Sequence, residues 1–251
     1  EITNIPKTTV YRILTNELHF VSSHLKWVSH FLNEAQKITR VKLYKSLLST
    51  IEKVKHQSFY LFFTGDESWI YLSTDHTIQW IHEGDEPSTR EKKMIGSKKI
   101  MLTVFWNPEG FLVVDLLPEG MHFNSEYFIN NILEKIFQIT AERRAECHRK
   151  VTLHFDYARP HTARKVIQYM DVHHMKRAPH PPFSPDIAAS DFYLFGYLID
   201  RLAELKFESP DELFEYINEI LKKIQKETLI NVFLEWEKRL KQVIENNGEY
   251  I

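Results

Sequence analysis

Three aspartates occupy positions where carboxylates can do chemistry. Asp66 and Asp156 each follow an apolar run typical of a buried strand, and Asp191 lies just inside a later predicted helix. One such aspartate alone is more often a turn former or a helix cap. Three of them converging on one sheet rim would repel one another unless cations neutralised them. Mg²⁺ or Mn²⁺ prefer such oxygen ligands, and two ions roughly 4 Å apart would activate a water or a 3′-hydroxyl and stabilise the leaving oxygen of a phosphodiester.

The order of the surrounding elements predicts a sheet that brings these aspartates together. An aromatic run of the kind found in buried central strands begins after residue 58. Turn-forming clusters at 73–76 and 107–110 separate segments that would form antiparallel hairpins. We expect strands over 59–63, 69–72, 78–81, 100–106, 111–117 and 151–155, helices over 124–144 and 162–170, and two more helical regions after residue 185. This order describes an α/β domain with a mixed sheet flanked by helices.

Two helices are predicted ahead of this sheet. The first, over residues 4–18, carries an apolar stripe and an exposed face with Lys7, Thr8, Tyr11 and Arg12. Such a face suits a recognition helix in the major groove of DNA, although most short helices of this kind only pack against a core. The second helix, over about 33–54, follows a connection that contains Trp27.

Composition excludes several classes of protein. The chain has 251 residues, 43% of them hydrophobic and 26% charged, which is enough to bury a large core. Its single cysteine, Cys147, excludes an intrachain disulfide and a thiolate-rich zinc site. The apolar runs are too short to cross a bilayer and no signal segment opens the chain, so we expect an intracellular protein that binds no membrane. The chain begins at Glu1, and we expect it to be a fragment whose N-terminal neighbour is missing.

The charge distribution predicts surfaces that bind phosphate. The net charge is −2, yet the first 65 residues carry 9 Lys and Arg against 4 Asp and Glu. Two basic stretches interrupt the acidic remainder: residues 90–99 hold five cations against one acid, and residues 143–177 hold nine against three. Any one patch is consistent with an ordinary solvated face, but three on one chain favour binding to nucleic acid.

Three segments resemble the mariner family of DNA transposases. They are TGDESW at 64–69, HFDYARPH at 154–161 and HPPFSPDIAASDF at 180–192, and 34 residues separate Asp156 from Asp191, as in that family. Similar segments follow in family order at 101–106, 124–127 and 247–250. Residues 9–14 resemble the second helix-turn-helix of the family, and residues 27–32 resemble its interdomain linker.

The resemblance implies a domain arrangement and a reaction. The arrangement is a remnant of the second helix-turn-helix at 1–20, a linker and connecting helix at 21–57, and a ribonuclease-H-like catalytic domain at 58–251 with a basic loop at 84–99; the first helix-turn-helix would be missing. The implied reaction is cut-and-paste transposition, in which the terminal inverted repeats of a transposon are cleaved and joined to TA sites in double-stranded DNA. A homodimer would perform it, in the nucleus if the host is eukaryotic.

The resemblance also implies roles for individual residues. Asp66, Asp156 and Asp191 become the catalytic triad that holds two Mg²⁺ or Mn²⁺ ions. The implied DNA contacts are Lys7, Thr8, Tyr11, Arg12, Trp69, Arg90, Lys92, Lys93, Lys98, Lys99 and Arg159. For Trp69 and Arg159, core packing and a surface ion pair are equally good explanations. The implied linker and dimer contacts are Trp27, Val28, His30, Phe31 and Leu32.

Three positions depart from the family pattern. Tyr157 stands where the family usually has Asn, and Ser29 and Ala189 stand where it usually has Pro. Tyr157 bears on the site because a bulky phenol beside a metal ligand alters access or the ligand's surroundings. An alternative function is therefore that of a domesticated or decayed transposase, which binds DNA without full transposition activity. The intact triad favours the active enzyme.

Overall fold

The computed structural model describes residues 7–17, 30–73, 98–203 and 205–251, and the chain divides into two compact units. The first unit spans Glu1–Phe31 and contains α1 (Lys7–Arg12), which continues as a π-helical turn over Ile13–Glu17. The predicted N-terminal helix is therefore confirmed over residues 7–17. The side chains of Lys7, Thr8 and Tyr11 lie outside the described part of the chain.

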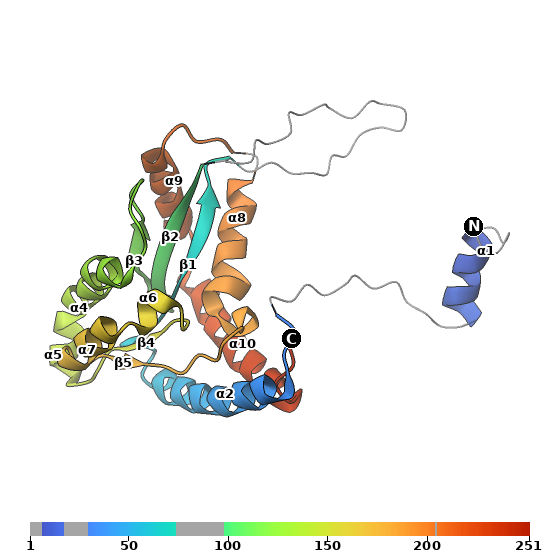
Figure 1. The fold of residues 1–251 in the computed structure, drawn as a ribbon, viewed down its shortest axis with the longest axis horizontal. Coiled ribbons are helices and arrows are strands. Elements are labelled where there is room, and N and C mark those ends of the chain that lie inside the picture. The colour runs from blue at the N-terminus through green and yellow to red at the C-terminus, as the bar shows by residue number, and fades with distance from the viewer. Residues whose placement is uncertain (1–6, 18–29, 74–97, 204) are drawn as a thin grey trace. The chain divides into compact units, whose positions relative to one another are not determined.

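The second unit, Leu32–Ile251, is built on a five-stranded mixed sheet (Figure 1). Its strands are β1 (Phe62–Tyr71), β2 (Lys99–Asn107), β3 (Gly110–Leu116), β4 (Thr152–His154) and β5 (Lys176–Arg177), in the order β3-β2-β1-β4-β5. β1, β2 and β3 pair antiparallel, whereas β4 pairs parallel with both β1 and β5. The predicted mixed α/β sheet is confirmed, and the two-residue strand β5 is an addition to it.

β1 differs from the prediction in a way that matters for the site. The sequence predicts two short strands, over 59–63 and 69–72, with Asp66 at the end of the first, but the structure has one ten-residue strand with Asp66 in its interior. The strand begins only at Phe62 because Phe59 has a φ of 56°, a left-handed turn. Gly65 does not end it. Instead the ring of Phe105 lies where a Cβ of residue 65 would be, 2.4 Å from that position. The predicted strand over 78–81 lies outside the described residues.

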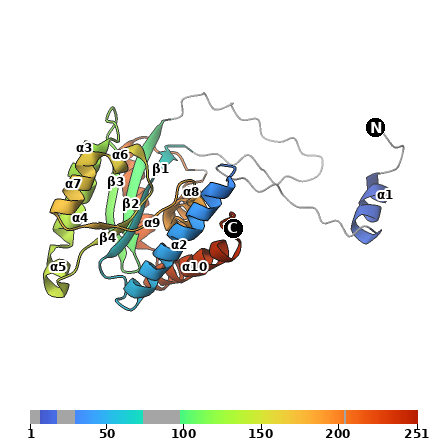
Figure 2. The same ribbon diagram turned by 60° about the horizontal axis from the view of Figure 1, so that its bottom comes forward.

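Helices cover both faces of the sheet (Figures 1 and 2). The helices on one face are α2 (Glu34–Lys55), α8 (Gly196–Leu202), α9 (Pro210–Lys222) and α10 (Lys226–Glu245), and Figure 2 shows α2 lying beside α10. The other face is covered by α3 (Ser125–Tyr127), a π-helical stretch over Phe128–Leu133, α4 (Glu134–Ile139) and α7 (Arg164–Val172), with α5 (Ala141–Cys147) and α6 (Arg159–Thr162) at its ends. Among the described helices, none is long and apolar enough to cross a membrane.

Because side chains alternate along the strands, they pack into two separate hydrophobic cores, one on each face of the sheet. Phe62 points into the core beneath α2 and α10, whereas Phe63 points into the core beneath α4 and α7. Val104 and Trp106 of β2 join the first core, and Phe105 joins the second. Asp66 has the same parity as Phe62, so its carboxyl lies on the α8–α10 face of the sheet.

A buried arginine joins three distant segments of this unit. Arg40 of α2 donates from Nε to the carbonyl oxygen of Gly248 (2.9 Å) and from Nη1 to Ser184 Oγ (2.7 Å). Its Nη2 pairs with Asp186 Oδ2 at 2.7 Å, and the arginine side chain is only 1% exposed. Arg40 therefore anchors both the C-terminus and the proline-rich segment that precedes Asp191.

We expect Arg40→Met to destabilise the fold by about 3–5 kcal/mol, because it leaves the carboxylate of Asp186 buried and uncompensated. Urea unfolding followed by tryptophan fluorescence measures the effect. Lys42→Met, on the exposed side of the same helix, is the control and should leave the unfolding midpoint unchanged. A shift for Arg40→Met no larger than that of the control would contradict the anchoring role.

Candidate active site

Asp66 and Asp156 lie at equivalent positions on neighbouring strands. β1 and β4 are parallel and Thr64 is in register with His154, so each aspartate stands two residues beyond a paired residue. Neighbouring strands lie about 4.8 Å apart, which brings the two carboxylates to adjacent places on one face. Asp156 falls after the end of its strand, as predicted, whereas Asp66 does not.

Asp191 reaches this face from a helix. It lies in a π-helical turn, Ser190–Phe195, that leads into α8. The indole Nε1 of Trp106 in β2 donates to Ser190 Oγ at 3.1 Å, which fixes the start of the turn against the sheet. The wide turn and this anchor hold Asp191 against β1, close enough to Asp66 for each carboxyl to affect the pKa of the other. The sequence placed Asp191 correctly just inside a helix.

The pKa values of Asp66 and Asp191 are raised because both carboxyls are buried and lie close to other carboxylates. Burial, followed by repulsion from Asp191, Glu67 and Asp156, raises the pKa of Asp66 well above its usual range. Loss of solvent around the Asp191 carboxyl, together with the charges of Asp156 and Glu67, raises its pKa to about 6, although the hydrogen bond with Asp66 opposes the shift. The Asp66–Asp191 pair therefore binds a proton more readily than isolated aspartates do, because the two carboxyls cannot both ionise freely.

A buried histidine, His161, joins Asp156 to a fourth carboxylate. Its Nδ1 lies 2.8 Å from Asp156 Oδ1 and its Nε2 lies 3.3 Å from Glu67 Oε2. Burial lowers the pKa of His161, but its bonds to Asp156 and Glu67 outweigh that effect and raise the pKa to about 9. The imidazolium in turn lowers the pKa of Asp156, against the raising effect of burial and with help from the backbone N–H of Ala158.

His161 and Glu67 both lie close in sequence to the predicted aspartates. His161 lies five residues after Asp156 inside a segment that resembles the family, and Glu67 directly follows Asp66. Because side chains alternate along a strand, Glu67 projects to the face opposite Asp66, where Phe128 and Phe155 enclose His161 at ring-centroid distances of 4.4 and 5.0 Å. No pattern in the sequence indicates that this contact crosses the sheet.

The chemistry of the donor set fits a hard divalent cation. Asp66, Asp156 and Asp191 offer only carboxylate oxygens, which Mg²⁺ and Mn²⁺ prefer, and their mutual repulsion is what a bound cation relieves. In the described part of the chain, no three His, Cys, Asp or Glu side chains stand ready around a single cation. Asp156 Oδ1 accepts bonds from His161 and Ala158, which leaves the other oxygen of this carboxylate for a cation.

Tyr157, the departure from the family pattern beside Asp156, packs against an arginine. The guanidinium of Arg177 stacks over the Tyr157 ring at 3.9 Å and over Phe155 at 4.5 Å. Arg177 Nη2 also donates a hydrogen bond to the backbone carbonyl of Asp156. Tyr157 is 44% exposed, and its ring helps to hold the turn that carries Asp156.

Two buried histidines lie beside the site on the α10 side. His154 Nδ1 is 3.0 Å from Thr64 Oγ1, and His154 Nε2 is 3.1 Å from His180 Nδ1. Burial lowers the pKa of His154 well below its usual range and lowers that of His180 to about 4, so both are neutral at pH 7. The His154 ring packs against Trp236 at a centroid distance of 4.7 Å and against His180 at 5.0 Å.

The structure brings two of the predicted DNA contacts together. Lys99 Nζ lies 4.4 Å from the ring centroid of Trp69 across the β1–β2 pair, and Trp69 is 44% exposed. Lys98 pairs loosely with Glu119 at 3.4 Å, and Arg159 is exposed at the start of α6. Arg90, Lys92 and Lys93 lie outside the described residues.

The predicted linker contacts fall at the boundary between the two units. Trp27 and Val28 lie outside the described residues. His30 and Leu32 are half-buried, and Phe31 is 90% exposed at the end of the first unit. Arg12, in the same unit, is exposed at the end of α1.

Comparisons with known proteins agree with this site. Residues 70–150 match the family model described as Transposase (partial DDE domain). The chain is 31% identical over 199 residues to the Mariner Mos1 transposase of Drosophila mauritiana, covering 77% of this chain and 56% of that protein. It is 28% identical over 252 residues to Histone-lysine N-methyltransferase SETMAR of Homo sapiens, covering 98% of this chain and 36% of that protein. The chain thus spans little more than half of one curated relative and about a third of the other.

Solved structures extend the agreement to the fold. The crystal structure of the Mos1 mariner paired end complex with Mn superposes with a TM-score of 0.85 at 26% identity, covering 97% of this chain and 71% of that one. The fold of the second unit is ribonuclease-H-like, as in the catalytic domain of that transposase. The matching family model, the sequence relatives and the shared fold together place the chain in the mariner family of transposases.

Proposed function

We propose that this chain carries the catalytic part of a cut-and-paste transposase that cleaves DNA at transposon ends and joins them to TA target sites. The observation that carries the proposal is the grouping of Asp66, Asp156 and Asp191 on one face of the sheet, close enough for each to perturb the pKa of another. Mutually repelling carboxylates are costly in a fold and are typical of functional sites. We also propose that the whole protein acts on transposon-end DNA and assembles as a homodimer.

The same three aspartates would hold two Mg²⁺ or Mn²⁺ ions. Solved Mos1 paired end complexes contain Mn or Mg, which supports this cofactor. When bound, the ions supply an activated water or 3′-hydroxyl and stabilisation of the leaving oxygen. The chain itself positions the ligands: His161 holds Asp156 through Oδ1, and Arg177 holds the backbone of the same residue.

Exposed aromatic and basic residues beyond the carboxylates would hold the DNA. The Trp69–Lys99 pair offers an aromatic face and a cation at the end of β1, and Arg159 adds a second cation from α6. The basic loop, with Arg90, Lys92, Lys93 and Lys98, would continue this contact along the transposon end. Lys7, Thr8, Tyr11 and Arg12 would bind DNA from the first unit.

A homodimer would hold two such sites on two transposon ends. Solved structures of the related Mos1 protein are paired-end complexes, and Phe31 leaves a large apolar side chain exposed beside the predicted linker. Trp27, Val28, His30 and Leu32 would complete the contact. We expect sedimentation velocity to show a dimer when transposon-end DNA is added to the chain. A strict monomer with and without DNA would contradict this assembly.

A strand-joining assay tests the proposed function. The chain is incubated with a plasmid that contains TA sites, a pre-cleaved transposon end and Mn²⁺, and joined products are resolved on a gel. We expect joined products with Mn²⁺ or Mg²⁺ and none with EDTA. DNA binding without joining under any divalent ion would instead favour the domesticated alternative, which the similarity to SETMAR keeps open.

Metal binding should weaken sharply in acid. The Asp66–Asp191 pair holds a proton whose pKa at Asp191 is raised to about 6, and a divalent cation must displace that proton. As the pH falls through this value the proton competes more strongly with the cation for the pair, so below pH 6 the Mn²⁺ affinity should fall about tenfold for each pH unit. Isothermal titration with Mn²⁺ at several pH values between 5 and 8 measures this dependence. A constant affinity across that range would exclude this pair as the ligands.

A further inference from the structure

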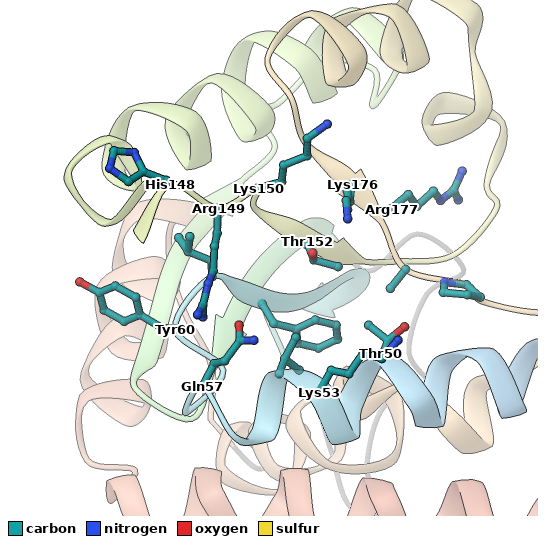
Figure 3. A pocket seen from close by; sticks show the side chains of 15 residues that line it. Thr50, Lys53, Gln57, Tyr60, His148, Arg149, Lys150, Thr152, Lys176 and Arg177 are labelled. Atoms are coloured by element: carbon teal, nitrogen blue, oxygen red, sulfur yellow. The ribbon is translucent and has the colours of Figure 1, made fainter. Parts of the chain in front are cut away.

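A cationic hollow lies at the sheet edge farthest from β3, outside the group of carboxylates. Its volume is about 510 Å³, and it opens between α2 and the β4–β5 edge (Figure 3). Among the described residues that line it, none is acidic and five are basic. The basic residues are Lys53, Arg149, Lys150, Lys176 and Arg177. We call this hollow the β4–β5 basic groove.

Three segments of the chain converge to build the groove. α5 ends at Cys147, and the next residue, His148, has a φ of 51° that turns the chain, so that Arg149 and Lys150 lie between α5 and β4. Lys176 and Arg177 form β5, whose pairing with β4 sets Lys176 beside Thr152. Figure 3 shows Lys53 on α2 across the hollow from these strands, and Arg149 reaching toward α2. Four of these cations therefore come from the basic stretch at 143–177.

The charges in the groove are not neutralised within the fold. Lys53, Arg149, Lys150 and Lys176 are all exposed, and no ion pair among the described residues involves them. A nearby carboxylate, Glu146, instead accepts a hydrogen bond from the Tyr60 hydroxyl at 2.9 Å. A second hollow of about 440 Å³ shares His148, Arg149 and Lys150 and extends the basic surface past Arg144. Unpaired cations gathered along an edge favour a polyanion over a single ion.

The groove is physically connected to the catalytic face. Arg177 lines the groove, yet its guanidinium donates to the backbone carbonyl of Asp156. From Lys150 to Asp156 the chain advances six residues, about 20 Å if fully extended. At about 3.4 Å per nucleotide of one duplex strand, that length corresponds to roughly six base pairs.

We propose that the β4–β5 basic groove binds the phosphate backbone of duplex DNA within about six base pairs of the cut. The identity of the ligand as DNA rests on the proposed function, whereas the groove and its cations do not. The side chains offer charges without a base-reading element in the groove, so the contact is independent of sequence. Its effect is to set the path of the duplex as it leaves the carboxylates.

Salt-dependent DNA binding by three proteins tests the proposal. They are the native chain, the groove variant Arg149→Ala/Lys150→Ala/Lys176→Ala, and the control Lys222→Ala/Lys223→Ala/Lys226→Ala, which removes three exposed lysines at the α9–α10 connection. Fluorescence anisotropy with a labelled duplex of about 30 base pairs gives Kd across a salt series. Each phosphate contact contributes about 0.9 to the slope of log K against log salt, so the groove variant should lose about 2–3 in slope and bind at least about tenfold more weakly.

The possible outcomes distinguish an error in the groove assignment from an error in the proposed function. We expect the control to match the native chain, and Arg149→Lys/Lys150→Arg/Lys176→Arg, which keeps the charges, to retain binding. A groove variant with native Kd and slope would overturn the groove assignment alone. Failure of the native chain to bind any duplex would overturn the proposed function as well. Displacement of the duplex by inorganic phosphate, or equally well by duplex RNA, at matched ionic strength would overturn the choice of DNA.

Discussion

Replacing Asp156 with alanine should reduce DNA nicking by about 10³-fold or more while DNA binding stays near its native level. The expected loss corresponds to about 4 kcal/mol of transition-state stabilisation, at about 1.4 kcal/mol for each factor of ten. Binding should survive because we expect the phosphate contacts to come from cations elsewhere, such as Lys99 and Arg159. Conversion of a supercoiled plasmid to its nicked form, measured beside anisotropy with the same DNA, separates the two effects.

The control for this substitution is Asp171→Ala, which removes an exposed aspartate of α7. It should nick DNA at the native rate. A second variant, Asp156→Asn, preserves the shape of the side chain and the hydrogen bond from Ala158, so its inactivity would not be due to a disrupted turn. Undiminished nicking by either Asp156 variant would remove this residue from the catalytic site.

Replacing Asp66 with asparagine should make the melting temperature of the chain nearly independent of Mn²⁺. In the native chain the raised pKa of Asp66 makes its ionised form costly above that pKa, and the cost disappears as the pH falls toward the ordinary value. Asparagine removes this cost, so the variant should melt at the same temperature as the native chain or higher at pH 7.5 without metal. Mn²⁺ at about a hundred times its Kd should stabilise the native chain by about 2.7 kcal/mol, or roughly 5–10 °C in Tm.

The Asp66→Asn variant should show almost none of that metal-dependent shift, because one of the ligands has lost its charge. Scanning calorimetry with EDTA and with Mn²⁺ measures both quantities on the same sample. Asp200→Asn, an exposed position in α8, should keep the native response. A native-sized Mn²⁺ shift in the Asp66 variant would show that the metal binds elsewhere.

Local patterns in the sequence were sufficient for most of the fold. Asn124 caps its helix through bonds to the backbone N–H groups of Glu126 and Tyr127, so the helix starts where the sequence predicts. β1 was divided wrongly because Thr64, Gly65 and Asp66 look like a turn in sequence. They remain in the strand because Phe105, nearly 40 residues away, fills the space above Gly65. A contact at that distance has no local signature.

For the candidate site, the sequence indicated the aspartates but not the contacts that surround them. The spacing of Asp156 and Asp191 and the segments around them identified the acidic residues, and the structure places those residues on one face. The contact of His161 with both Asp156 and Glu67 was not predictable, because it depends on how α6 packs against the sheet. The groove formed by Arg149 and Lys176 was visible only as a basic stretch, since β5 had no strand pattern of its own.

Anomalous diffraction from crystals of this chain grown with Mn²⁺ shows directly whether Asp66, Asp156 and Asp191 bind the metal. Data collected near the manganese absorption edge locate each bound ion without reference to activity. We expect anomalous peaks beside the carboxylates of Asp66, Asp156 and Asp191, and their loss in crystals of the Asp66→Asn variant. Peaks at other residues, or none beside these three at Mn²⁺ concentrations that support strand joining, would contradict this expectation.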